Sequence, residues 1–183
     1  MRVNFFLRED ARDDAPALPP GISLKLWRPS EHTLPPWSAL RVAYWLQARL
    51  GMFADERFAE LSLWDGGVLI HRLIVTPRWR RFPFMEAGDL QLGALWTHPQ
   101  YRRRGLARIA MAEAHRLFGG PGQRFWYLAD SANLPSTALA LASGYRLAGT
   151  GRRTAPLGLR LFGQFQIDRP PTAGSRRSVG RLA

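Results

Sequence analysis

The chain has 183 residues, of which 46% are hydrophobic, and it carries a formal net charge of +12 and no cysteine. This length and apolar content suffice for one domain with a full core, while the lack of cysteine excludes disulfides and thiolate metal sites. The four histidines show no ligand spacing. We therefore expect one domain over residues 1–168 that uses no metal, followed by a basic, disordered tail at residues 169–183.

The charge and the apolar runs also limit the partners. A strongly basic chain favours a polyanionic partner, such as nucleic acid, an acidic membrane surface or a phosphate-bearing cofactor. No segment approaches the roughly 18 apolar residues of a membrane span, and the first ten residues lack the apolar run of a signal peptide. We expect a soluble cytoplasmic protein without a membrane partner, and we leave open whether it forms a homodimer.

Hydrophobic periodicity predicts the elements of the first half of the chain. Alternation with a period of two indicates strands, and recurrence at three to four residues indicates a helix. Asp65-Gly66-Gly67 is typical of a hairpin turn. The expected elements are a strand at 1–7, a proline-rich linker or loop at 8–20, a strand at 21–27, a helix at 37–53, and a hairpin of strands at 58–64 and 68–75.

The second half shows the same alternation of signals. An exposed loop that interleaves arginines with aromatic residues is expected before the next strand, because two prolines interrupt it. The expected elements are a loop at 76–86, a strand at 89–97, a helix at 106–118, a strand at 125–129, a helix at 133–143, a strand at 145–149, and a last strand within 157–167.

Residues 95–107, with the sequence LWTHPQYRRRGLA, join a strand to a helix through a basic turn that contains Gly105. A helix start presents amide groups that have no partner within the helix, and its dipole adds partial positive charge. Glycine lets the backbone approach a phosphate closely, and guanidinium groups suit phosphate oxygens. The junction therefore predicts an anion site, although an arginine cluster can also be a solvated surface.

Three features, in order along the chain, resemble the GNAT superfamily of acetyl-CoA-dependent N-acetyltransferases. The first is the pyrophosphate signature of that family, which stands here at residues 102–107 between a strand and a helix. The second is Asn133 at the start of a helix that ends in Gly144-Tyr145. The third is the pair of strands that flank the signature. The resemblance implies an α/β domain of the α+β type, with a mixed, mostly antiparallel sheet of about six to seven strands and helices on both faces.

The resemblance also implies acetyl-CoA as co-substrate and a small-molecule primary amine as acceptor. One strand would pair with the pantetheine arm, and the signature would hold the pyrophosphate. Asn133 would either hold the cofactor arm or only cap its helix. The cofactor-binding residues expected on this basis are Leu95, Trp96, Thr97, Arg102, Arg103, Arg104, Gly105, Leu106, Ala107, Asn133 and Ser136.

The chain departs from the family at both positions that usually carry protons. Gln91 stands where many members have a glutamate base, and Ala140 stands where they have a tyrosine that protonates the leaving thiolate. The substitute bases that we consider are His71, Asp89 and Glu86, although His71 also fits a core histidine and Asp89 a turn carboxylate. Ser136 or Tyr145 is the substitute that we consider for the thiolate.

The arginine-aromatic loop lies where acceptor-binding segments are often found in this family. Arginines and aromatic rings together suit an anionic, ring-bearing amine such as a phosphorylated amino sugar, unless the rings only anchor the loop. The acceptor-binding residues expected here are Arg78, Arg80, Arg81, Phe84 and Gln91.

Two other functions remain open at this point. Gln91 and Ala140 also fit a non-catalytic acyl-CoA sensor on the same fold. The net charge fits nucleic-acid binding, but the sequence contains no recognisable helix-turn-helix, RNA-recognition or zinc-finger pattern.

Overall fold

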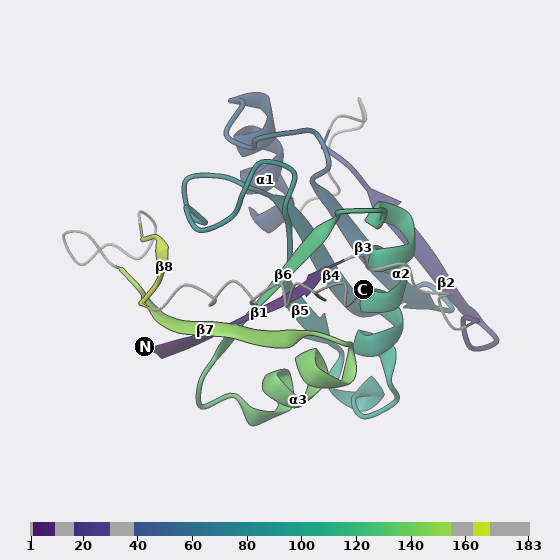
Figure 1. Ribbon diagram of the computed structural model, residues 1–183. Coiled ribbons are helices and arrows are strands. Elements are labelled where there is room, and N and C mark those ends of the chain that lie inside the picture. The colour runs from purple at the N-terminus through teal and green to yellow at the C-terminus, as the bar shows by residue number, and fades with distance from the viewer. Residues whose placement is uncertain (1, 10–16, 30–38, 155–162, 169–183) are drawn as a thin grey trace, which may run out of the picture.

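One mixed sheet of eight strands, in the order β2-β3-β4-β5-β6-β1-β7-β8, organises the chain. The computed structural model describes residues 2–9, 17–29, 39–154 and 163–168 (Figure 1). The strands are β1 (Arg2–Glu9), β2 (Ile22–Trp27), β3 (Ala59–Asp65), β4 (Val68–Pro77), β5 (Leu90–Thr97), β6 (Arg124–Asp130), β7 (Arg146–Arg153) and β8 (Phe165–Ile167). Every pairing in this order is antiparallel except that of β5 with β6.

The hairpin of β3 and β4 forms where the sequence predicts it. Gly66 and Gly67 make its turn with φ values of 52° and 91°, a region that glycine enters without a steric penalty. Leu61, Leu63 and Leu73 alternate along the two strands and are completely buried. Their side chains form the floor of the main core.

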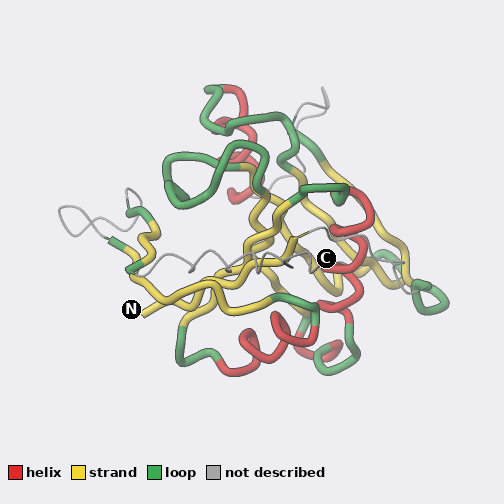
Figure 2. The backbone as a smooth tube through the Cα atoms, in the orientation of Figure 1, coloured by secondary structure: helices red, strands yellow, loops and turns green. Residues whose placement is uncertain are grey.

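Helices cover both faces of the sheet, as predicted. Helix α2 (Leu106–Phe118) and helix α3 (Leu134–Ala142) pack on the face that carries Leu61 and Leu63, and α2 buries residues spaced three to four apart in the main core. Helix α1 (Ala39–Arg49) lies on the other face, where the Arg41 Nε donates to Glu60 Oε1 at 3.2 Å. Figure 2 shows the strands in the centre, with the helices around them.

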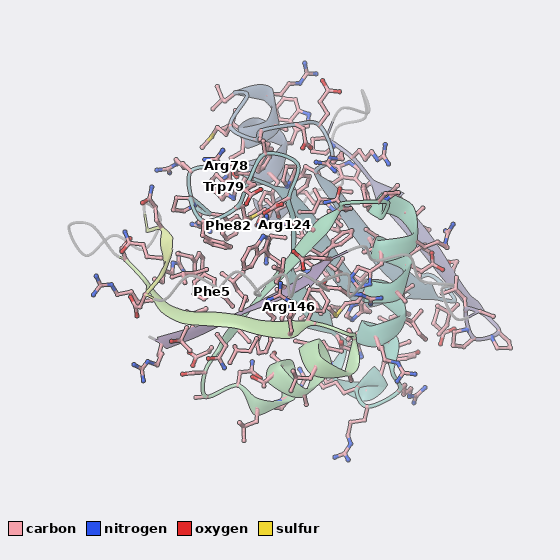
Figure 3. All side chains as sticks on the ribbon, in the orientation of Figure 1. Phe5, Arg78, Trp79, Phe82, Arg124 and Arg146 are labelled. Atoms are coloured by element: carbon pink, nitrogen blue, oxygen red, sulfur yellow. The ribbon has the colours of Figure 1, made fainter. Side chains whose placement is uncertain are left out.

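A second cluster of buried side chains fills the face opposite α2. It includes Phe5 and Trp126, and it also takes in Trp79, Phe82 and Met85 from the loop between β4 and β5. Trp79 and Phe82 lie beside each other (Figure 3), with ring centroids 6.1 Å apart. The prediction that this loop is exposed is therefore wrong for its aromatic residues, because they bury their rings against the sheet.

Several predicted boundaries change. Strand β1 continues to Glu9, so Arg8 and Glu9 belong to the sheet and not to the linker, and β7 continues to Arg153. Helix α1 ends at Arg49 and not at residue 53, because Gly51 adopts a φ of 62° that breaks the helix. The sheet has eight strands and not six or seven. The predicted tail and most of the predicted linker lie outside the described residues, as do residues 157–162 of the last predicted strand.

No helix within the described ranges is both long and apolar enough to cross a bilayer.

Candidate functional site

Strands β5 and β6 pair only at their first residues and then separate. The parallel pairing covers Leu90 to Leu92 on β5 and ends where Leu92 meets Tyr127. Just beyond, Ala94 adopts a φ of 49°, which is unusual for a residue with a side chain, and the register with β4 shifts between Arg72 and Ile74. This bulge turns β5 away from β6 and leaves a fork between the two strands.

A cleft of about 360 Å³ opens from this fork on the face that α2 and α3 cover. Its floor is the diverging end of β5, and its walls are the starts of the two helices. The residues that line it are Leu95, Thr97, Tyr101, Arg102, Arg103, Gly105, Leu106, Ala107, Arg108, Tyr127, Pro135, Ser136 and Leu139.

The start of α2 presents its amide groups to this cleft. Gly105 is the N-cap residue with a φ of 75°, and no side chain caps the helix there. Arg103 also has a positive φ, 63°, so the turn before the helix alternates its backbone conformation in the manner of an anion-binding nest. A Cβ added at Gly105 would meet nothing within 4 Å, so the structure leaves room beside the backbone. The geometry suits a phosphate group.

The comparisons with known proteins bear on this arrangement. A model of the acetyltransferase (GNAT) family matches residues 23–145, which is more than half of the chain. The chain belongs to the GNAT acetyltransferase family. No curated protein sequence matches it.

Solved structures show the same GNAT fold at low sequence identity. A Drosophila protein has a TM-score of 0.55 at 20% identity, covering 81% of this chain and 48% of the other. A tandem GNAT protein from the clavulanic acid biosynthesis pathway has a TM-score of 0.54 at 18% identity, with coverages of 80% and 50%. A GCN5-related N-acetyltransferase from Sphaerobacter thermophilus has a TM-score of 0.53 at 17% identity, and the match covers 81% of this chain and 49% of the other. The chain thus spans about half the length of these structures.

Most of the predicted cofactor residues of this GNAT domain meet at the cleft, and three do not. Trp96 instead lies under Arg72, whose guanidinium carbon is 6.0 Å from the ring centroid. Arg104 lies over the Tyr101 ring. Asn133 caps α3, because its Oδ1 accepts the Ser136 amide at 3.1 Å. The observed contact of Asn133 is therefore the helix cap.

A second pocket, of about 260 Å³, lies on the opposite face of the same fork. Its charged and polar side chains come from four separate parts of the chain. The residues that line it are Val3, Tyr44, Arg81, Phe82, Gln91, Gly93, Ala94, Leu128, Ala129, Asp130 and Phe165. Because β5 and β6 contribute to both pockets, the two pockets share the fork as their common wall.

Charge in this second pocket is divided between one acid and one base. Asp130 is the only carboxylate among the described residues that line it, and its Oδ1 accepts the Ala132 amide at 3.0 Å. Burial lowers the pKa of Arg81, and the nearby Arg153 lowers it further. Burial raises the pKa of Tyr44, which keeps that phenol neutral.

The predicted acceptor residues lie in three places. Arg81 and Gln91 line the second pocket, and Gln91 occupies the space beside Gly93 that a Cβ there would need. Arg78 and Arg80 line a neighbouring hollow beside the residues that follow α1. Phe84 lines neither pocket, because it packs edge-on against Phe5 and Trp126 of the second cluster, with both centroid distances at 4.9 Å, and is partly buried there.

None of the three predicted bases lines either pocket. Asp89 is buried, and its Oδ2 accepts the Trp126 indole at 2.7 Å, the Glu86 amide at 2.9 Å and the Arg124 guanidinium at 3.1 Å. The Glu86 side chain is 72% exposed and pairs with Arg124 at 2.6 Å. Both carboxylates thus fasten the loop between β4 and β5 to the sheet.

His71, the third predicted base, is completely buried on β4. Its Nδ1 lies 2.8 Å from Thr97 Oγ1, and its Nε2 has no partner among the described residues. Burial lowers the pKa of His71 to about 4, because the charged ring would lose its hydration. The ring is therefore neutral at pH 7 and lies beside Thr97, which lines the cleft between β5 and the two helices.

This histidine makes stability depend on pH in a defined direction. Between about pH 6.5 and pH 4, His71 is protonated in the unfolded chain but remains neutral in the folded chain. Acid therefore favours the unfolded state. We expect the free energy of unfolding to fall by about 2 kcal/mol between pH 7 and pH 5 on account of His71. For His71→Asn, denaturant titrations at pH 7 and pH 5 should show a fall in the free energy of unfolding that is smaller by about this amount. An equally steep fall would contradict the assignment.

Proposed function

We propose that this chain is an N-acetyltransferase that moves an acetyl group from acetyl-CoA to the primary amine of a small molecule. The observation that carries the proposal is the fork, because it joins a phosphate-suited cleft on one face of the sheet to a charged pocket on the other. Two substrates that approach from opposite faces would meet at the only break in the pairing of the two strands. Direct transfer between them requires no covalent intermediate on the protein.

The cofactor side is proposed from the cleft lining. Amide groups around Gly105 would hold the pyrophosphate, and Arg102, Arg103 and Arg108 would add charge. Beyond the bulge, the β5 backbone at Leu95 and Thr97 would pair with the amides of the pantetheine arm in the manner of an added strand. Acetyl-CoA supplies the activated acetyl group.

The acceptor side is proposed from the charges of the second pocket. Asp130 would hold the amine and accept its proton, a role that Gln91 cannot fill because an amide does not take up a proton at neutral pH. Arg81 would pair with an anionic group on the same molecule. An amino sugar phosphate, or a similar amine with a negative charge, satisfies both ends.

Binding and turnover together test this proposal. We expect acetyl-CoA to raise the thermal midpoint, and CoA release to be faster with glucosamine 6-phosphate than with glucosamine. Replacing Arg81 by alanine should lower the ratio of these two rates by about tenfold or more, because the ion pair between Arg81 and the phosphate is lost in a partly desolvated pocket. Arg78→Ala is the matched control, since Arg78 lines the neighbouring hollow.

The same experiment separates the alternative functions. Stabilisation by acetyl-CoA without CoA release across a broad amine panel would instead support an acyl-CoA sensor, the function that Gln91 and Ala140 leave open. Equal rates of CoA release with charged and neutral amines would contradict the proposal that the acceptor is anionic, but would still support acetyl transfer.

A further inference from the structure

Tyr127 stands at the point where the fork opens. It is the last residue of β6 that pairs with β5, opposite Leu92, and it lines the cofactor cleft. Its ring is only 4% exposed and lies between Phe6 and Tyr145, with centroid distances of 6.4 and 6.1 Å. The packing therefore fixes the ring and leaves its edge at the apex of the cleft.

Ser136, in the first turn of α3, lines the same cleft and acts on the Tyr127 hydroxyl as a hydrogen-bond partner. Ser136 is itself placed by the cap, since its amide donates to Asn133. Burial raises the pKa of Tyr127 more than this hydrogen bond lowers it, so the phenol keeps its proton at neutral pH. Tyr127 is thus a neutral proton donor whose ring is fixed by its packing against Phe6 and Tyr145.

The other hydroxyl groups described along the cleft already have partners. Tyr101 donates to Asp65 Oδ2 at 3.0 Å, and Thr97 Oγ1 lies 2.8 Å from His71 Nδ1. Tyr145 does not line the cleft, and its hydroxyl lies 2.9 Å from His115 Nε2 in the core. Breaking a thioester releases a thiolate that needs a proton, and among the described residues that line the cleft this leaves the Tyr127–Ser136 pair to provide it.

We infer that Tyr127 is the catalytic acid of the acetyl transfer proposed above, giving its hydroxyl proton to the sulfur of CoA. The amine nitrogen forms a bond to the acetyl carbon with its lone pair, and the electron pair of the C–S bond goes to sulfur. Sulfur takes the Tyr127 proton, while the amine gives its proton to Asp130. An amide and a thiol result. Asp130 then releases its proton to water and water returns one to Tyr127, which restores both side chains. This inference rests on the proposed function.

Contact between Tyr127 and sulfur can be measured without an acceptor. Isothermal titration would compare CoA with desulfo-CoA, in which hydrogen replaces the thiol, for the native chain and for Tyr127→Phe. We expect the native chain to bind CoA about three- to tenfold more tightly than desulfo-CoA, and Tyr127→Phe to lose this preference. Tyr145→Phe is the matched control, because it removes a hydroxyl from the same core that faces His115, and it should keep the preference.

The outcomes separate this inference from the proposed function. If the native chain does not bind CoA, both fail. If the native chain binds CoA, and Tyr127→Phe prefers CoA over desulfo-CoA as strongly as the native chain does, only the inference about Tyr127 fails. Should Tyr127→Phe not fold, Ser136→Ala, which leaves the buried ring in place, must weaken the preference for CoA, and an unchanged preference overturns the assignment. With an amine that is turned over, Tyr127→Phe should lower kcat about 100-fold and leave the KM for the amine nearly unchanged.

Discussion

Replacing Asp89 by alanine should lower the free energy of unfolding by about 3 to 5 kcal/mol. The Asp89 side chain is 5% exposed and accepts hydrogen bonds from the Trp126 indole and the Arg124 guanidinium. Alanine would leave a cavity and would deprive the Trp126 indole and the Glu86 amide of their acceptor, and each unsatisfied donor that water cannot reach costs about 1 to 3 kcal/mol. Urea or guanidinium unfolding monitored by tryptophan fluorescence measures the change.

Glu86→Ala is the matched control for Asp89. Glu86 also pairs with Arg124, but its side chain is 72% exposed, so its removal should cost less than about 1 kcal/mol. Asp89→Asn further separates structure from catalysis, because it keeps the shape while removing the charge. A folded Asp89→Asn variant that binds acetyl-CoA but shows no turnover would contradict a purely structural role and would support Asp89 as the general base.

Replacing Gly105 by valine should weaken CoA binding about 10- to 100-fold. Valine disfavours the φ of 75° found at Gly105, and its side chain would enter the space in which the cleft approaches the start of α2. Disturbing charge-assisted hydrogen bonds to a phosphate has an effect of this size. Isothermal titration with CoA gives the affinity directly.

Gly122→Val provides the control for backbone strain. Gly122 has a φ of 73°, and a Cβ there would also meet nothing within 4 Å, but it lies in the turn before β6 and does not line the cleft. Both variants should lose similar stability, about 1 to 2 kcal/mol, while only Gly105→Val loses affinity. Equal loss of affinity in the two variants would assign the effect to general destabilisation.

Local sequence patterns predict the elements that local interactions determine. Helix α2 begins at Leu106 and ends at Phe118 as predicted, because its apolar spacing and the flanking glycines act over a few residues. The β3–β4 hairpin follows from Gly66 and Gly67 for the same reason. The neighbours of β1 could not be predicted, because a strand pattern does not specify which strands it will join.

The two sides of the site differ in the same way. The cofactor cleft is built largely from one continuous stretch, so the motif that contains Gly105 indicates it. The second pocket, in which we propose that the acceptor binds, brings together Tyr44, Arg81 and Asp130 from three distant elements, and of these three only Arg81 had a local signal. Tyr127 was missed because a strand tyrosine is expected in the core, and its position at the fork depends on where β5 leaves β6.

The placement of β1 has a consequence for how the chain folds. Phe5 pairs with Leu128 on one side and with Gly149 on the other, so both partners lie more than 120 residues away along the chain. Forming such contacts closes a very long loop, and the chain loses conformational entropy before the contacts stabilise it. Proteins rich in such contacts therefore fold slowly. We expect the β2–β5 half of the sheet to form early and the half around β1 to close last. The second face of the fork, which depends on Val3 and Asp130, would then be completed in the final step of folding.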